Sequence, residues 1–202
     1  MNPLQKIHNH YAPRIRESEP GWKILDWASE QGQRLRFETL AKHLRKSGAE
    51  SLTLLDVGCG TADLFAFLQN ELPAIHYTGV DLLAEIVAEA RRRHADAQIL
   101  QGDVFDGTVF PPRSFDVIFC SGVFNLDLGN NETFVPRALS VLRALARRAV
   151  VVNFLHARAA NKFAGCHYYA PETIMALCQP LAPRVELDEG YLENDFTVVM
   201  RH

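Results

Sequence analysis

The sequence is poor in cysteine, lacks a long apolar run and carries no marked excess of either charge. No two of its four cysteines form a Cys-x-x-Cys pair, so we expect neither a disulfide framework nor a zinc or other metal site. No segment approaches the roughly 18 apolar residues of a membrane helix, and the first residues lack the apolar core of a secretion signal. We therefore expect a cytoplasmic protein that contacts no membrane.

The charge balance also limits the kind of partner. Twenty-one Lys and Arg residues against 24 Asp and Glu residues give a formal charge of −3 at pH 7. Proteins that mainly bind a phosphate backbone usually have a clear excess of basic residues, so a dedicated nucleic-acid binder is not expected. The length of 202 residues suffices for a full hydrophobic core.

From residue 50 onward, short apolar runs alternate with amphipathic helical stretches. Such alternation predicts a parallel sheet with helices on both faces. Two further strands follow a helix at 171–179 and are joined only by a loop, so the last strand should pair antiparallel. We predict a doubly wound, Rossmann-like α/β fold with a mostly parallel sheet of seven strands and an antiparallel C-terminal strand. The predicted strands are 52–57, 76–81, 97–100, 115–119, 149–154, 185–187 and 196–200.

The first 49 residues contain no strand-like run and predict a helical cap, separate from a sheet domain at 50–202. One helix shows an apolar face through Phe37, Leu40 and Leu44, and Ser47-Gly48 should end it. Residues 17–21 predict a turn in which the flexible backbone of Gly21 is useful. A later helix should contain a Glu89–Arg93 ion pair. Another helix should end near residue 146, with Arg147-Arg148 solvated at its end.

Three groups of polar residues follow successive predicted strands. Asp56-Val57-Gly58-Cys59-Gly60 forms a glycine-rich turn after the first strand, Asp81 ends the second strand, and Asp103 follows the third. Ligands of such sheets bind beyond the carboxyl ends of the strands. Asp81 could accept hydrogen bonds from both hydroxyls of a ribose, and Asp103 could accept one from an exocyclic amine.

The acidic residues around this turn bear on the type of nucleotide. A dinucleotide fingerprint places a small residue where this chain has Asp63, and Asp56 precedes the glycines. Each carboxylate beside a pyrophosphate would cost about 1 kcal/mol or more. A ligand with an ammonium and a sulfonium group suits these acids better, which favours S-adenosylmethionine over NAD.

The segment Leu54-Leu55-Asp56-Val57-Gly58-Cys59-Gly60-Thr61 resembles the first motif of class I S-adenosylmethionine-dependent methyltransferases. Residues 115–120 are similar to the fourth strand of that family, and Ala62 stands where many members have a third glycine. The resemblance implies that the turn holds the methionine part of the cofactor and that Asp81 holds its ribose. It also implies that Asp103 and the Val104 amide face the adenine. The full set of candidate cofactor-binding residues is Asp56, Gly58, Cys59, Gly60, Asp81, Leu82, Asp103, Val104, Cys120 and Arg36.

Each candidate outside the turn has a structural alternative. Cys120 is expected to be a small wall of the cofactor pocket rather than a nucleophile. His167 is a candidate general base, but it could equally be a loop histidine beside packing tyrosines. Tyr11 is a second catalytic candidate that could close over the cofactor. Arg36 could reach the cofactor carboxylate or could simply lie on the polar face of its helix. Asn194-Asp195 could be simple turn chemistry.

The leading hypothesis is methyl transfer from S-adenosylmethionine to a small-molecule acceptor under the N-terminal cap. Three alternatives stay open: a methyltransferase acting on RNA or protein, an NAD-dependent oxidoreductase, and a non-catalytic partner subunit. The sequence gives no indication of the oligomeric state.

Overall fold

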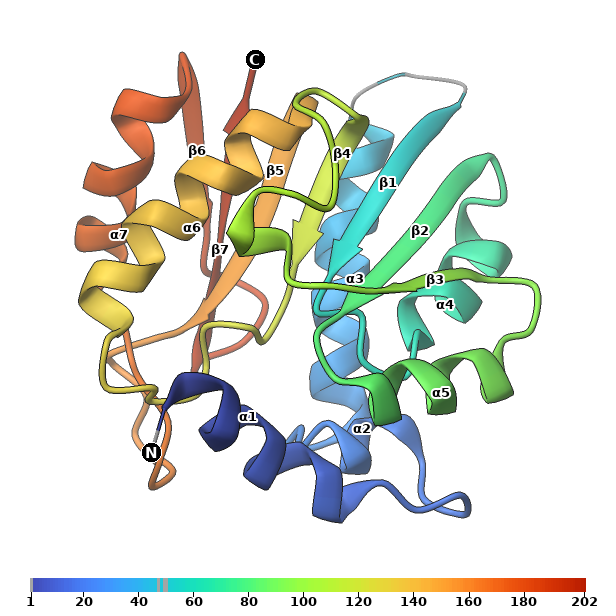
Figure 1. Ribbon diagram of the computed structural model, residues 1–202. Helices are drawn as coiled ribbons and strands as arrows, with labels where there is room; N and C mark the ends of the chain where they lie inside the picture. Colours follow the sequence, from blue (N-terminus) through green and yellow to red (C-terminus); the bar gives the residue numbers. More distant parts are fainter. Residues whose placement is uncertain (1, 47, 49–50) are drawn as a thin grey trace. The chain divides into compact units, whose positions relative to one another are not determined.

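The computed structural model describes residues 2–46, 48 and 51–202 (Figure 1). Backbone contacts divide the chain into a first unit, residues 1–103, and a second unit, residues 104–202. Each unit is described by itself below. The predicted boundary between cap and sheet domain, at 49/50, falls outside the described residues, as does Ser47, and that division stays a prediction.

The first unit contains the N-terminal helices and three parallel strands. β1 pairs with β2, and β2 pairs with β3. The order β1-α4-β2-α5-β3 follows the predicted alternation, because each strand is a short apolar run. The elements are α1 (Pro3–Tyr11), η1 (Ala12–Arg14), α2 (Gly21–Ile24), α3 (Glu30–Arg45), β1 (Leu52–Val57), α4 (Asp63–Glu71), β2 (Ile75–Asp81), α5 (Ala84–Arg93) and β3 (Gln98–Gln101).

The second unit contains four strands. β4 and β5 are parallel, while β7 lies antiparallel between β5 and β6. The loop between β6 and β7 is too short for a parallel crossover, which is why this pair is a hairpin. The elements are η2 (Val104–Asp106), β4 (Phe115–Cys120), α6 (Asn131–Leu145), β5 (Ala146–Leu155), α7 (Pro171–Cys178), η3 (Gln179–Leu181), β6 (Arg184–Asp188) and β7 (Asp195–Arg201).

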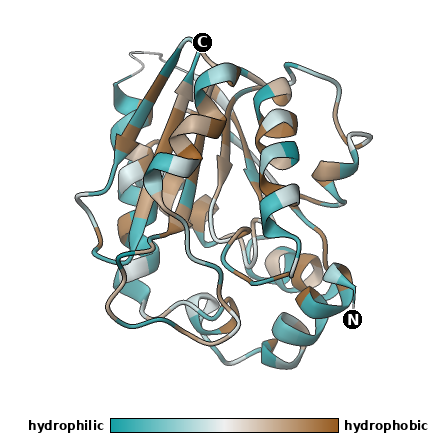
Figure 2. Ribbon diagram, turned by 90° about the vertical axis from the view of Figure 1, so that its left-hand side faces the viewer, coloured by the Kyte–Doolittle hydropathy of each residue, from teal (hydrophilic) through white to brown (hydrophobic). Residues whose placement is uncertain are grey.

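The strand order of the seven-stranded sheet is β3-β2-β1-β4-β5-β7-β6, which confirms the predicted Rossmann-like fold and its antiparallel C-terminal strand. Figure 2 shows that the strands are predominantly hydrophobic, as buried strands of an α/β fold should be. One boundary prediction was wrong. β5 begins at Ala146, directly after α6, so Arg147 and Arg148 belong to a strand and not to a helix end.

The N-terminal segment is attached to α5 by charged and apolar contacts. The predicted Glu89–Arg93 pair is present at 2.6 Å, and Glu89 also binds Arg92 at 2.8 Å. The Arg92 hydrogen bond is the main reason that the pKa of Glu89 falls to about 2. The same two arginines donate to the backbone carbonyls of Glu17 and Glu19. The turn before α2 is therefore held against the end of α5.

Gly21 is needed for close packing rather than for an unusual backbone angle. It begins α2 instead of ending a turn, and its φ is not positive. A Cβ built there would lie 2.1 Å from an oxygen of Asp63 and 2.4 Å from the hydroxyl of Thr61. The prediction that Gly21 serves a turn was wrong because the constraint comes from α4, some forty residues along the chain.

Ala62 occupies the left-handed region, with φ 60° and ψ 30°, immediately before α4. This conformation destabilises an L-residue by roughly 1–2 kcal/mol relative to glycine. The difference explains why glycine is common at this position in the family that the sequence resembles. The chain tolerates alanine because its methyl group is fully buried.

We expect Ala62→Gly to raise the free energy of unfolding by up to about 1 kcal/mol, because relief of this backbone strain exceeds the loss of about 0.8 kcal/mol from the buried methyl group. Urea unfolding measures the change. Ala66→Gly, inside α4, is the matched control and should lower the stability by about 1 kcal/mol. Equal destabilisation by both substitutions would contradict the assignment of strain to Ala62.

Candidate cofactor and acceptor sites

The glycine-rich turn after β1 is fastened to the end of β2 by backbone hydrogen bonds. The amides of Gly58 and Cys59 both donate to the carbonyl of Val80, at 2.9 and 3.1 Å. Gly58 and Gly60 have φ values of +70° and +55°, which few residues with a Cβ adopt. Hydrogen bonds and positive φ values therefore hold the predicted turn in a defined conformation at the carboxyl ends of β1 and β2.

Asp81, the last residue of β2, joins this turn to α5. One of its oxygens accepts a hydrogen bond from the Gly60 amide at 3.0 Å, and the other accepts one from the Leu83 amide at 3.1 Å. Burial raises the pKa of Asp81, while the amides of Leu83, Gly60 and Leu82 oppose that shift. A carboxylate offers about four lone-pair sites, so Asp81 keeps acceptor capacity for a ligand.

Asp56 lies beneath the turn and is buried. The hydroxyl of Tyr77, on β2, donates to its carboxylate at 2.8 Å. Burial raises the pKa of Asp56 to about 7, although the Tyr77 hydrogen bond lowers it. Burial and the neighbouring carboxylates of Asp56 and Asp81 also raise the pKa of the Cys59 thiol, so Cys59 is a neutral filler of the turn. Tyr77 carried no recognisable sequence signal.

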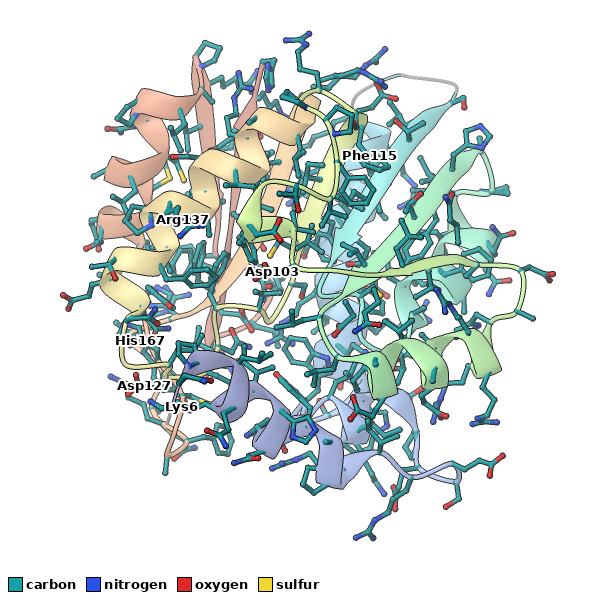
Figure 3. The ribbon with its side chains drawn as sticks, in the orientation of Figure 1. Lys6, Asp103, Phe115, Asp127, Arg137 and His167 are labelled. Carbon is teal, nitrogen blue, oxygen red and sulfur yellow. The ribbon has the colours of Figure 1, made fainter. Side chains whose placement is uncertain are left out.

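The loop after β3 reaches the same edge of the first unit. The amide of Gly102 donates to the backbone carbonyl of Asp81 at 3.0 Å. The next residue, Asp103, is exposed, and Figure 3 shows it at the end of this loop. The structure therefore brings together three predicted acids of the first unit, Asp56, Asp81 and Asp103, at successive strand ends.

The N-terminal helices cover the glycine turn. A Cβ at Gly60 would lie 2.6 Å from Leu25, so this leucine rests directly on the turn. Gln33 of α3 donates to Asp63 at 3.0 Å, and Thr61 donates to the same carboxylate oxygen at 2.9 Å. Leu25 and Gln33 are site residues that sequence reasoning missed, because each acts through a contact between distant segments.

Tyr11 and Arg36 both have defined places in this covering segment. Tyr11 packs on the apolar cluster of Ile24, Leu83 and Ile86, and Leu83 lies two residues after Asp81. Arg36 is only 5% exposed, which makes the alternative of a solvated polar helix face wrong. Its guanidinium lies 4.2 Å from the centre of the Trp27 ring and donates to the Gly32 carbonyl at 2.6 Å.

In the second unit, a buried polar chain supports the loop that follows β4. Asp195 accepts a hydrogen bond from the Asn153 amide group at 2.8 Å, and the Gly122 amide donates to the Asn153 oxygen at 3.0 Å. Asp195 is fully buried at the start of β7, so the expectation of simple turn chemistry was wrong. Val104 and Cys120, the predicted cofactor contacts of this unit, are buried as well.

The loop after β4 also pairs with the segment that carries His167. The His167 amide donates to the carbonyl of Asn125 at 2.8 Å, and the imidazole lies 4.6 Å from the Tyr169 ring. Figure 3 shows His167 on this segment after β5. Within the described residues, the Ser121 hydroxyl and the Asn125 side-chain oxygen are buried without a hydrogen-bond partner. Such atoms are expected where a polar ligand binds.

The part of the chain that the structure describes contains no group of three or more His, Cys, Asp or Glu side chains placed to hold a metal ion. None of its helices combines the length and apolar character needed to cross a bilayer.

The raised pKa of Asp56 predicts a pH-dependent stability. Folding raises this pKa from 3.8 to about 7, so between these values the folded protein keeps a proton that the unfolded chain releases. The contribution of Asp56 therefore becomes less favourable as the pH rises from about 4 to about 7 and is constant above. We expect Asp56→Asn to gain stability relative to the wild type across this interval, by at most about 4 kcal/mol.

Urea unfolding of both proteins at several pH values between 4 and 8 measures this difference. Asp96→Asn, which changes an exposed aspartate, should show no such pH dependence. A constant difference between Asp56→Asn and the wild type over the whole interval would show that the folded and unfolded pKa values of Asp56 are alike.

Comparison with known proteins places this site in a family. The methyltransferase-domain family matches residues 54–161, just over half of the chain. A Mycobacterium tuberculosis protein provisionally named a methyltransferase is 28% identical over 165 residues, which are 77% of this chain and 96% of that protein. Trans-aconitate 2-methyltransferase of Escherichia coli O1:K1 is 31% identical over 97 residues, 48% of this chain and 37% of that enzyme.

A relative with a different kind of substrate also matches. Ribosomal RNA small subunit methyltransferase C of Erwinia tasmaniensis is 30% identical over 128 residues, 60% of this chain and 35% of that enzyme. This chain therefore spans only about a third of the length of the two relatives with named substrates.

The fold has solved counterparts. The crystal structure of magnesium protoporphyrin IX methyltransferase from Synechocystis PCC 6803 with bound S-adenosylmethionine matches with a TM-score of 0.72 at 14% identity. The match covers 100% of this chain and 98% of that one, and at this identity it shows a common fold. With the matched family and the seven-stranded sheet, it shows that this chain belongs to the class I S-adenosylmethionine-dependent methyltransferases.

Proposed function

We propose that this protein transfers the methyl group of S-adenosylmethionine to a small-molecule acceptor, with Asp81 as the main cofactor-binding residue. The observation that carries the proposal is the arrangement of Asp81 itself. Each of its oxygens accepts one backbone amide and keeps lone pairs for further donors. Two adjacent ribose hydroxyls are donors with matching spacing.

The other cofactor contacts follow from the same edge. Gly58 and Gly60 would let the methionine part approach the backbone, with Cys59 filling the turn and Asp56 below it. Leu82 would flank the ribose, while Asp103 and the amide of Val104 would face the adenine. Cys120 would form a small wall of the cofactor pocket.

Arg36 would bind the carboxylate of the cofactor. It follows Gln33 by three residues on α3, so the two side chains lie on one face of the helix. Gln33 contacts Asp63 at the glycine turn, which directs this face toward the turn. A guanidinium has five N–H donors and can bind a carboxylate in addition to the Gly32 carbonyl.

When bound, S-adenosylmethionine supplies a methyl group activated by a positively charged sulfur, and the acceptor nucleophile replaces that sulfur on the methyl carbon by in-line attack. The protein then has to hold the acceptor near 3 Å from that carbon and keep water out. In the second unit, Ser121 and Asn125 offer buried polar atoms that would orient an acceptor with hydroxyl or amino groups. His167 is the proposed general base, and Tyr11 the proposed closing residue from the cap.

A small acceptor is favoured by the charge balance and by one relative. The formal charge of −3 does not suit an extended polyanion, and trans-aconitate 2-methyltransferase is named for a small molecule. Methylation of RNA is the second candidate, because a ribosomal RNA methyltransferase is also among the relatives. We further propose a cytoplasmic location.

Asp81→Asn should weaken the binding of S-adenosylhomocysteine by about 1–3 kcal/mol, because the amide offers fewer acceptor sites to the ribose. Calorimetric titration measures the loss, and far-UV circular dichroism with urea unfolding checks that the variant is folded. Asp96→Asn, at an exposed position, should bind like the wild type. Unchanged binding by a folded Asp81→Asn protein would place the ribose elsewhere.

The acceptor class is tested by incubating the protein with methyl-labelled S-adenosylmethionine and separate pools of small metabolites, RNA and protein. Label in the small-molecule fraction is expected, and His167→Ala should reduce its rate while leaving cofactor affinity unchanged. Label only in RNA or only in protein would overturn the small-molecule proposal. Binding of NAD but not of S-adenosylhomocysteine, or binding without transfer to any pool, would overturn methyl transfer itself.

A further inference from the structure

Four arginines gather at one end of the sheet in the second unit, around the start of β5. Arg147 and Arg148 are the second and third residues of this strand. Arg143 lies in the last turn of α6. Arg113 precedes β4, and its amide donates to the carbonyl of Ala144 at 2.8 Å, which fixes it beside the end of α6. We call Arg113, Arg143, Arg147 and Arg148 the arginine cluster.

The cluster has little negative charge to balance it. Arg147 and Arg148 lie 3.9 and 3.5 Å from the same oxygen of Asp116. Among the described residues, the side chains of Arg113 and Arg143 form no ion pair, and the Nε atom of Arg143 is buried without a hydrogen-bond partner. Asp116 therefore pairs with only two of the four arginines.

Burial and like charge act together at Arg143. Burial lowers the pKa of Arg143, and the charge of Arg113 lowers it further. His202 also lies beside the arginine cluster, because its backbone amide donates to the carbonyl of Arg148 at 2.9 Å. Burial lowers the pKa of His202, and the charges of Arg143 and Arg113 add to this effect. Cations that repel one another and are partly removed from water are unfavourable without an anion.

We propose that the arginine cluster binds a phosphate group, with Arg143 and Arg113 as its principal ligands. A guanidinium presents a planar fork of N–H donors that matches two phosphate oxygens, and a doubly charged anion would offset the repulsion. The buried Nε of Arg143 would donate to one oxygen, and the exposed Arg113 would close over another. Arg147 and Arg148 would contribute longer-range attraction while bound to Asp116.

This site is separate from the proposed methyl-transfer chemistry. The cluster lies at the amino end of β4 and β5, whereas Ser121 and Asn125 follow the carboxyl end of β4. The six residues of β4 separate the two ends by about 20 Å. The phosphate site therefore does not depend on the identity of the methyl acceptor.

The test is a titration of the full chain with inorganic phosphate, followed through the arginine Nε–Hε signals in ¹H–¹⁵N spectra. Sodium chloride at matched ionic strength provides the reference. We expect saturable shifts of the Arg143 and Arg113 signals with phosphate only. Arg143→Gln and Arg113→Gln should each weaken binding about tenfold. Arg34→Gln, which removes an exposed arginine of the first unit, should leave binding unchanged.

Two further measurements keep the test sharp. The pKa of His202 should rise when phosphate binds, because the anion offsets the neighbouring arginines, and this readout does not require a variant to fold. A sugar monophosphate and an RNA oligonucleotide without terminal phosphates then distinguish a phosphate monoester from a phosphodiester backbone as the ligand. Stronger binding of either, lost in Arg143→Gln, supports the site and identifies the source. Linear shifts that chloride reproduces, with an unchanged His202 pKa, would overturn the proposal.

Discussion

The carboxylate of Asp81 is the constraint on which the organisation of the first unit depends. Its two oxygens hold the amides of Gly60 and Leu83, which belong to two different strand-to-helix connections. The turn after β1 and the start of α5 are thereby fixed at one distance from each other. Since both bonds favour the ionised carboxylate while burial opposes it, Asp81 remains a strong acceptor in a partly dry setting.

The N-terminal segment uses the platform that Asp81 defines. Leu83 and Ile86 form the apolar surface on which Ile24 and Tyr11 pack, and Leu25 rests on Gly60. The segment therefore contacts both connections that the carboxylate joins. A change in the position of the turn would move the covering helices with it. The segments that pack on Gly21 and Gly60 are too close to these glycines to slide past them.

Local patterns predicted the strands and the acids at their ends, because apolar runs and glycine turns depend only on residues that are adjacent in sequence. They did not reveal Gln33 or Tyr77, whose roles come from single hydrogen bonds to residues twenty or thirty positions away. Asp195 was misread for the same reason, since its partner Asn153 lies on another strand. The arginines at the start of β5 were misplaced because α6 passes into the strand without a loop.

The structure also refines the electrostatic argument about the ligand. With a pKa of about 7 and a hydrogen bond from Tyr77, Asp56 is buried and carries only part of a charge near neutral pH. One oxygen of Asp63 is already engaged by Gln33 and Thr61. The acidity that discourages a pyrophosphate therefore rests mainly on Asp81 and the remaining oxygen of Asp63. Both carboxylates would attract a sulfonium ligand with a free ammonium group, whereas they would repel a pyrophosphate.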